Sequence, residues 1–147
     1  MRPSQVLAVL TFLSASALAH AGAPTIAGTW RIIGDKSGEA EALVRITEQD
    51  GVVEGKIISI FPRPGVDPNA LCDQCPGERR NQPIRGMTIL AGFHQEEGEY
   101  KGGTILDPDT GDIYRCTIKM SADHKKLQVR GFIGIPLIGR TQTWVRE

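Results

Sequence analysis

Residues 41–61 have the sequence EALVRITEQDGVVEGKIISIF, and this stretch decides the fold class. Apolar residues alternate with polar ones on both sides of Asp50-Gly51, which is the pattern of strands with one buried face. Asp-Gly between two such runs is the strongest short-range signal for a β-hairpin. The stretch therefore predicts two antiparallel strands joined by a tight turn.

The same pattern continues on both sides of this hairpin. Short segments rich in Ile, Val and Thr are separated by Gly, Pro and Asp, and no long segment has helical periodicity. Consecutive hairpin-linked strands leave two unpaired edges unless the first strand pairs with the last. We therefore expect an all-β fold, an eight-stranded antiparallel up-and-down barrel that is filled by its own side chains or holds one small ligand. The predicted strands are 29–33, 41–48, 52–61, 84–93, 99–106, 112–120, 127–133 and 140–146.

The N-terminal segment has the features of a secretory signal peptide. A basic residue at position 2 precedes an apolar run, residues 6–18, that is too short to span a bilayer. Small residues offer a cleavage site after Ala19 or Ala21, and no cysteine lies near it for lipid attachment. We expect a signal peptide at 1–21 and a single domain at 22–147. The exported protein is then neither a lipoprotein nor stably inserted in a membrane.

The charge balance narrows the class of partners. The chain has 17 Lys+Arg and 17 Asp+Glu residues. Loss of the basic residue at position 2 with the signal peptide leaves a slight negative charge. Nucleic-acid binding needs a basic footprint for the phosphates, so no nucleic-acid partner is expected. No motif in the chain indicates a cofactor.

The sharpest local motif is Cys72-x-x-Cys75, within LCDQCPGERR at residues 71–80. It lies in a predicted loop at 62–83 that contains five prolines. Loops of this length are usually lids, binding loops or disordered, and the prolines with a cysteine clip favour an ordered lid. Alternating chain direction places this loop at the barrel end opposite the N-terminus, together with the turns at 34–38, 107–111 and 134–139.

Three kinds of chemistry compete for this motif. An oxidising compartment favours a structural disulfide. A redox pair of the thioredoxin type sits at a helix N-terminus, which the loop does not provide. A zinc site needs a ligand beyond the three cysteines, and His94 and His124 are expected at the opposite end of the barrel. We predict a Cys72–Cys75 disulfide, with a bridge from Cys116 to one of them as the alternative, and no metal or catalytic site.

The two ends of the predicted domain carry a resemblance to a known superfamily. Gly28-Thr29-Trp30 opens the first predicted strand, and Trp144-Val145-Arg146 closes the last. A Gly-x-Trp at the start with a basic residue late in the final strand resembles the signature of the lipocalin-type superfamily. The resemblance implies that Arg146 stacks on Trp30 at a closed barrel floor. The alternative is that the two tryptophans are simply core anchors.

Three longer motifs carry a closer resemblance. They are ALCDQCPGE at 70–78, GTILDP at 103–108 with Gly111 and Tyr114, and RGFIG at 130–134 followed by GRTQTW at 139–144. Together they resemble the exported bacterial family called domain of unknown function 2147, over residues 28–146. The resemblance implies a lipocalin-like barrel in the bacterial envelope, and hence a periplasmic location. It brings no established activity.

These features favour a barrel that binds one small apolar or amphipathic molecule under the clipped lid. Tyr114 and Cys116 share the inward face of the sixth predicted strand, and Arg130 and Arg140 lie where they would reach an anionic head group at the mouth. The alternative is a filled barrel that acts as a non-catalytic envelope interaction or structural protein, with an envelope protein as its partner. A thiol-redox function ranks third, and the lack of a catalytic set argues against an enzyme. The candidate ligand contacts are Tyr114, Cys116, Arg130, Arg140 and Trp144.

Overall fold

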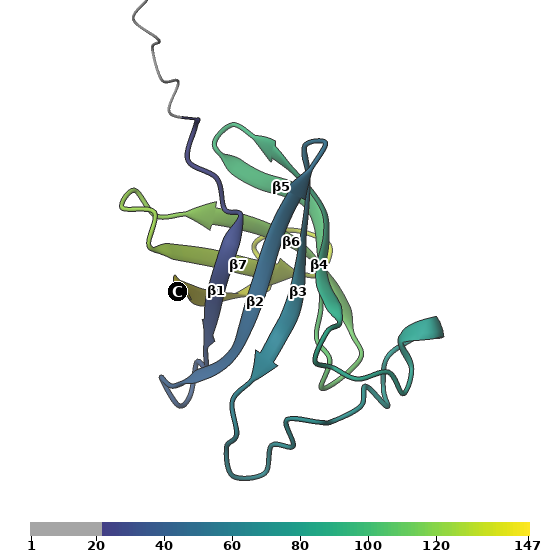
Figure 1. Ribbon diagram of the computed structural model, residues 1–147. Coiled ribbons are helices and arrows are strands. Elements are labelled where there is room, and N and C mark those ends of the chain that lie inside the picture. The colour runs from purple at the N-terminus through teal and green to yellow at the C-terminus, as the bar shows by residue number, and fades with distance from the viewer. Residues whose placement is uncertain (1–21) are drawn as a thin grey trace, which may run out of the picture.

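Eight antiparallel strands form a closed barrel in which each strand pairs with the next and the last pairs with the first (Figure 1). The computed structural model describes residues 22–147, and the signal peptide predicted at 1–21 lies outside the described residues. The predicted fold class is confirmed. The strands are β1 (Gly28–Ile33), β2 (Ala40–Gln49), β3 (Val52–Ile60), β4 (Thr88–Glu96), β5 (Glu99–Leu106), β6 (Ile113–Met120), β7 (Lys126–Phe132) and β8 (Gly139–Arg146).

The fourth strand is the one whose predicted start is wrong. We expected it at residue 84, but β4 begins at Thr88. The preceding residues bond to other segments, since the Ile84 amide donates to the Ala70 carbonyl at 3.1 Å and the Gly86 amide to the Ile57 carbonyl at 2.7 Å. The β3–β4 loop therefore covers residues 61–87 and contains a short 3-10 turn at Gly77–Arg79.

Closure of the barrel depends on the pairing of β1 with β8. Trp30 lies opposite Arg146, and Ile32 lies opposite Trp144. This pairing removes both sheet edges, which would otherwise expose unpaired amides and carbonyls. Within residues 22–147, no helix has the length and apolar character needed to cross a membrane.

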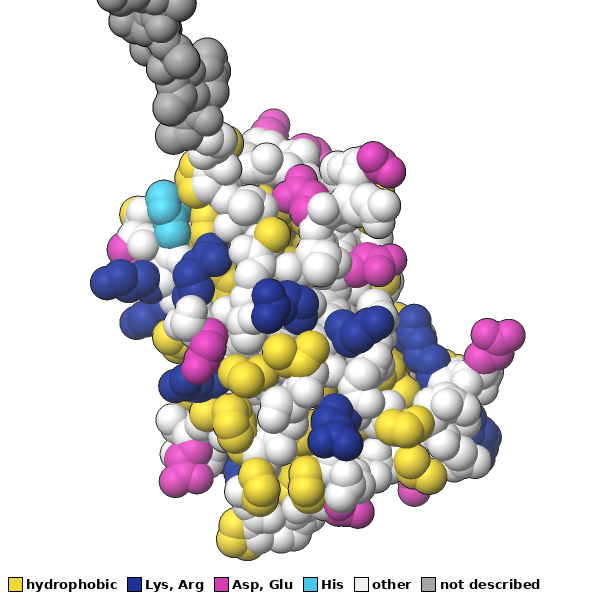
Figure 2. Space-filling view, viewed as in Figure 1, with side chains coloured by type: hydrophobic (Ala, Val, Ile, Leu, Met, Phe, Trp, Pro, Cys, Tyr) yellow, Lys and Arg dark blue, Asp and Glu magenta, His cyan; other side chains and the backbone are white. Residues whose placement is uncertain are grey.

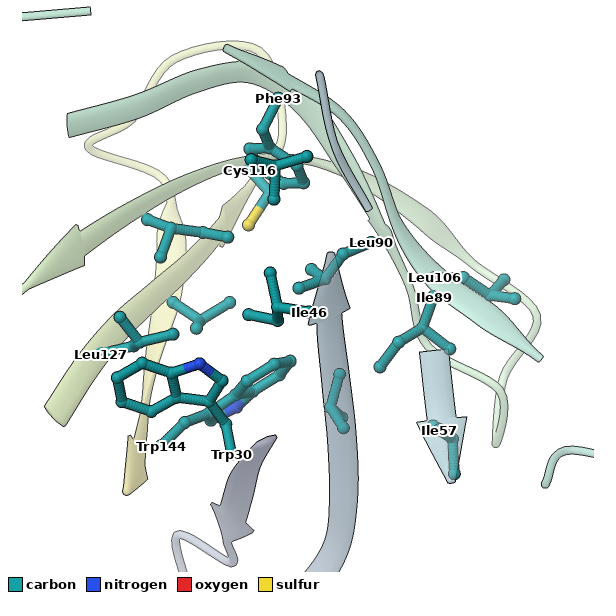
Figure 3. Close-up of a cluster of buried hydrophobic side chains, with 14 of the residues drawn as sticks. Trp30, Ile46, Ile57, Ile89, Leu90, Phe93, Leu106, Cys116, Leu127 and Trp144 are labelled. Atoms are coloured by element: carbon teal, nitrogen blue, oxygen red, sulfur yellow. The ribbon is translucent and has the colours of Figure 1, made fainter. Parts of the chain in front are cut away.

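The core follows from the two-residue period of each strand, which turns alternate side chains inward. Buried aliphatic and aromatic side chains from all parts of the barrel meet in its interior (Figure 3). Glycines make room for the largest of them. A side chain at Gly103 would overlap the ring of Phe93, and one at Gly55 would overlap Leu90. Large side chains thus pack against small positions on the neighbouring strands.

The barrel floor is built around Trp30 and Arg146. The Arg146 guanidinium lies 4.2 Å from the centre of the Trp30 ring. It also donates to the carbonyl oxygens of His124 at 2.8 Å and Thr25 at 3.0 Å. The Trp30 indole donates to the Ile26 carbonyl at 2.7 Å. The β6–β7 turn and the segment before β1 are thereby fastened across this end of the barrel.

The outer face is polar where strands face solvent. Figure 2 looks onto β1, β2 and β3, and shows Lys and Arg side chains in a band across the middle of this face with hydrophobic side chains below it. Arg31 on β1 pairs with Glu147, next to the end of β8. This face therefore adds an ion pair at the seam where the barrel closes.

Candidate functional site

The β3–β4 loop is stabilised by a β-bridge between its own two arms and by a hydrogen bond to β2. Leu71 and Pro83 form an antiparallel bridge. On the next residue, the Cys72 amide donates to the Gln82 carbonyl at 2.8 Å. Near the start of the loop, the Arg63 guanidinium donates to the Glu41 carbonyl of β2 at 2.9 Å. These bonds pair backbone groups of the loop with one another and with β2, so the loop has a defined conformation.

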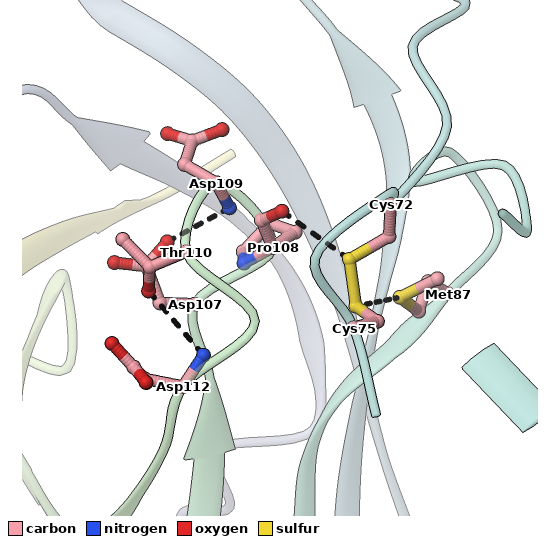
Figure 4. Close-up of a disulfide and its surroundings, with 8 residues drawn as sticks. All are labelled: Cys72, Cys75, Met87, Asp107, Pro108, Asp109, Thr110 and Asp112. Carbon is pink, nitrogen blue, oxygen red and sulfur yellow. Dashed lines mark hydrogen bonds between the residues drawn. A yellow bond between two sulfur atoms is a disulfide. The ribbon is translucent and has the colours of Figure 1, made fainter. Parts of the chain in front are cut away.

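A Cys72–Cys75 disulfide clips the loop, as we predicted (Figure 4). Both cysteines are buried, and the Cys72 sulfur lies 3.3 Å from the Pro108 carbonyl oxygen in the β5–β6 turn. A disulfide sulfur carries no proton, so this is a packing contact and not a hydrogen bond. Gly111 of the same turn has a φ of +77°, and a side chain there would overlap the Gln74 backbone. The clip and the β5–β6 turn therefore fit closely together.

A cavity of about 630 Å³ lies between this loop and the barrel interior. Because side chains from six strands contribute apolar atoms, its inner wall is largely hydrophobic. The inner wall includes Ile32, Ile57, Ile89, Ile105, Val129 and Trp144. Charged side chains line it nearer the loops, namely Glu41, Arg63, Asp67, Asp107, Asp109 and Arg140. The cavity thus has an apolar inner part and a rim that carries both signs of charge.

Three of the five predicted ligand contacts line this cavity. They are Tyr114, Arg140 and Trp144. Arg130 and Cys116 do not line it. Arg130 lies between two inward positions of β7, Val129 and Gly131, so its side chain points outward and donates to the Pro136 carbonyl at 2.7 Å.

Cys116 is in the packed core instead of the cavity wall. It lies opposite Gly103, over which the Phe93 ring packs, and Figure 3 shows it beside Phe93. It is a free, buried thiol, so the alternative bridge to the clip is not formed. Burial raises the pKa of the Cys116 thiol to about 12. The thiol is therefore protonated at neutral pH and does not act as a nucleophile.

Electrostatics at the rim are set by the β5–β6 turn. The Tyr114 hydroxyl donates to an Asp112 carboxylate oxygen at 3.3 Å. Loss of hydration and the negative charges of Asp112 and Asp107 raise the pKa of Tyr114 above its usual value. The phenol therefore stays protonated and remains a hydrogen-bond donor at the cavity wall.

Two arginines at the rim have carboxylate neighbours. The Arg140 guanidinium donates to Asp35 at 2.6 Å. The Arg63 guanidinium lies 3.9 Å from the Glu41 carboxylate. These pairs balance part of the rim charge, whereas Asp109 forms no ion pair among the described residues.

Several cavity residues were missed from the sequence. Gln142 lines the cavity and lies on the same face of β8 as Arg140 and Trp144, so its alternation with these two was a usable signal. Asp107 and Asp109 were interpreted only as turn residues. They do form such a turn, since Asp107 accepts from the Asp109 amide at 2.9 Å. The turn also borders the cavity, which its sequence does not reveal.

The residues that the structure describes hold no cluster of side chains that could bind a metal ion. Across residues 22–147, no three His, Cys, Asp or Glu side chains are grouped as metal ligands. Two of the three cysteines are taken up by the disulfide.

Comparison with known proteins agrees with this architecture. The model of the family described as "Uncharacterized protein conserved in bacteria (DUF2147)" matches residues 28–146. A solved structure, protein HP1028 from the human pathogen Helicobacter pylori, described as belonging to the lipocalin family, superimposes with a TM-score of 0.70. The two chains are 19% identical, and the match covers 84% of this chain and 83% of that one. At this identity the likeness bears on the fold alone. No curated protein gives a significant match.

Proposed function

The chain belongs to the bacterial family described as uncharacterized proteins (DUF2147), and from that premise we propose that it is a periplasmic barrel that binds one small, partly apolar molecule. The observation that carries this proposal is the cavity of about 630 Å³ under the clipped loop. Ligand sites in proteins are typically clefts of about 300–1,000 Å³ with mostly apolar walls. A barrel filled by its own side chains would leave no such space.

The lining indicates the chemistry of the ligand. Isoleucines of β3, β4 and β5 with Trp144 surround the inner part, where an apolar body would be desolvated favourably. At the rim, Arg140, the protonated Tyr114 hydroxyl and the Asp107 carboxylate offer hydrogen-bonding groups. An amphipathic molecule with a polar end at the mouth matches this division.

The clipped loop supports a carrier more than a redox function. Both disulfide sulfurs belong to residues that are at most 1% exposed, so a thiolate of a substrate protein has no access to them. The loop instead presses against the β5–β6 turn and covers the cavity. Its role in this proposal is to retain the ligand.

The expected export is tested separately from binding. The chain expressed in a bacterium from its own start codon should be recovered from the periplasm with a new N-terminus after Ala19 or Ala21. N-terminal sequencing and intact mass measure this directly. Recovery of the uncleaved chain from the cytoplasm would remove the periplasmic part of the proposal.

Binding is tested with a neutral, apolar fluorescent probe, N-phenyl-1-naphthylamine, and residues 22–147, which contain the complete barrel. We expect saturable binding with one probe per chain. Ala70→Trp should weaken it at least about tenfold, because the indole would occupy volume now available at the cavity wall. Ala91→Trp is the matched control, since Ala91 is half-buried like Ala70 but does not line the cavity.

The result that contradicts binding is equally clear. Absence of saturable fluorescence, or equal weakening by the two tryptophan substitutions, would exclude the cavity as the site. Native mass spectrometry of the protein purified from the periplasm adds the natural ligand as an observed mass. If the probe does not bind in the cavity, the remaining candidate function is that of a filled barrel that acts as an interaction protein.

A further inference from the structure

The loop between β7 and β8 exposes an unusual amount of apolar surface. Residues 133–138 have the sequence IGIPLI, and we call this segment the apolar mouth loop. Its four aliphatic side chains are largely exposed, with Ile133 at 66%, Ile135 at 53%, Leu137 at 86% and Ile138 at 64%. Isolated exposed apolar residues are common, but four of them within six positions form a patch that marks an interaction site.

The backbone of this loop is satisfied largely from within. The Ile133 amide donates to the Ile138 carbonyl at 3.0 Å, and the Ile138 amide donates to the Ile135 carbonyl at 3.1 Å. Arg130 reaches the loop from β7 and donates to the Pro136 carbonyl at 2.7 Å and the Leu137 carbonyl at 3.5 Å. The loop thus displays its side chains while most of its carbonyl oxygens are already bonded.

That arrangement matters for the nature of the partner. A segment that leaves water for hydrocarbon must satisfy its backbone polar groups internally, because lipid chains offer no hydrogen bonds. A protein partner imposes no such demand, since its own backbone and side chains supply partners. Pro136 also lowers the cost of moving this loop into hydrocarbon, because it has no amide hydrogen that needs a hydrogen-bond partner.

Two arginines lie beside the loop, and the rim of the adjoining cavity also carries the carboxylates of Glu41, Asp67, Asp107 and Asp109. No charged residue lies between Phe132 and Gly139. Arg130 is at the base of the loop, and the Arg115 guanidinium lies 5.6 Å from the Phe132 ring centre just before it. Neither arginine forms an ion pair among the described residues. Arginines beside an apolar tip can keep their charge at the headgroup level while the tip is buried.

The loop is also continuous with the cavity. Ile133 and Ile138 contribute to the cavity lining at its rim, and Ile135 and Leu137 extend the apolar surface outward. An apolar molecule would therefore meet hydrophobic surface along the whole way from the loop tip to the cavity wall.

We propose that the apolar mouth loop inserts into the boundary between headgroups and acyl chains of a lipid leaflet, with Arg115 and Arg130 facing the phosphates. This is a surface-bound state, of the kind that apolar tips and nearby cations support without a membrane-spanning segment. It goes beyond ligand binding as an interaction surface. If the ligand proposal also holds, docking directs the cavity mouth to the membrane, where an apolar ligand is concentrated.

Sedimentation with lipid vesicles tests the proposal. Residues 22–147 are used, so that the apolar run at 6–18 cannot contribute. The chain should pellet with vesicles of phosphatidylcholine, and more strongly when phosphatidylglycerol is included. Ile135→Ser combined with Leu137→Ser should weaken partitioning at least about tenfold, because two aliphatic side chains no longer leave water.

The matched control removes the same two residue types elsewhere. Ile58 and Leu71 are 39% and 51% exposed and lie outside the loop. The double variant Ile58→Ser, Leu71→Ser should pellet like the unaltered chain. Thermal unfolding of both double variants verifies that each remains folded.

Three results would overturn the proposal. They are no pelleting of the unaltered chain, equal loss in the two double variants, and a dimer in vesicle-free buffer that only the loop variant dissociates. The last result would assign the loop to a second copy of the chain. If phosphatidylglycerol does not increase pelleting, Arg115 and Arg130 do not contribute to membrane binding. Probe binding measured without vesicles is independent, so the ligand proposal can fail or stand separately.

Discussion

At the floor of the barrel a single side chain, Arg146, joins the ends of the fold, whereas at the mouth a long loop with a disulfide borders an open cavity. Arg146 stacks on Trp30 and bonds to carbonyls of the β6–β7 turn and of the segment before β1. Among the described residues, no single side chain joins the loops at the mouth in the way that Arg146 joins segments at the floor. The Cys72–Cys75 disulfide closes a short segment of one loop, which packs against one neighbouring turn, and a cavity of about 630 Å³ lies between the loop and the barrel interior.

The two ends therefore differ in packing: side chains fill the barrel at Trp30, whereas open volume remains at the mouth. Dense packing around Trp30 should supply much of the stability, although Cys72, Cys75, Ile84 and Met87 of the mouth loop belong to the same buried cluster. The mouth can therefore carry charged rim residues and exposed aliphatic side chains that would weaken a core. If this division is correct, changes at the floor should alter stability, and changes at the mouth should alter binding.

The largest effect is expected from the two tryptophans. Trp30→Ala should lower the free energy of unfolding by about 5 kcal/mol and Trp144→Ala by about 3 kcal/mol, at the two ends of the range for buried aromatic residues. Trp30 also holds the Arg146 guanidinium, while Trp144 already borders a cavity. Urea unfolding followed by circular dichroism measures both. Equal losses, or a larger loss for Trp144→Ala, would contradict the assignment of stability to the floor.

The disulfide should have a smaller effect on stability and a clear one on binding. Replacing Cys72 and Cys75 together by Ser removes a very short covalent loop, for which the entropic cost is about 2 kcal/mol. The probe should dissociate faster, because the loop is no longer fixed against Pro108. Stopped-flow release of N-phenyl-1-naphthylamine measures the rate.

Cys116→Ala provides the control for cysteine removal, since Cys116 lies outside the clip and the cavity. It should leave the dissociation rate unchanged. An unchanged rate in the Cys72→Ser, Cys75→Ser variant as well would mean that the clip does not retain the ligand.

The smallest effect concerns Cys116, which lies in the packed interior between the two ends. Burial raises the pKa of its thiol from an ordinary value of 9.0 to about 12. The folded state therefore holds the thiol proton more tightly than the unfolded chain does. The protonated thiol makes its full contribution to the free energy of unfolding below pH 9, and this contribution is lost as the pH rises to about 12. At pH 10 the expected loss is about 1 kcal/mol.

Urea unfolding at neutral pH and at pH 10 measures this loss, with Cys116→Ala as the comparison that lacks the thiol. The difference between the two pH values should be smaller in the variant. If iodoacetamide modifies Cys116 in the folded chain at neutral pH, the open end reaches further into the barrel than the cavity lining indicates.

Much of the fold could be predicted from local pattern. The hairpin at Asp50-Gly51 joins β2 to β3, and all eight strands lie close to their predicted positions. The start of β4 was misplaced because Ile84 has the apolar character of a strand residue but bonds to Ala70 within the loop. Local pattern cannot tell these two uses of an isoleucine apart, since the choice depends on a partner fourteen positions away in the chain.

The candidate site was only partly predictable. Tyr114 was found from strand alternation, because side-chain direction is a local property, and Arg140 was found from its nearness to the mouth. Arg130 was misjudged because nearness to the mouth does not decide whether a side chain points inward. Cys116 points inward but lies beside the packing of Phe93 over Gly103, so the cavity does not reach it.

By itself, the sequence determined that this chain forms an antiparallel eight-stranded barrel whose first and last strands meet, because alternation, turn residues and the cost of open edges are properties of short segments and their order. Only the tertiary structure decided that Cys72 bonds to Cys75 and leaves Cys116 alone, and that the barrel is packed at Trp30 but hollow under the loop. An unfilled volume is the difference between the space that the strands enclose and the side chains that enter it. That difference depends on all eight strands at once, and no single stretch of the sequence contains it.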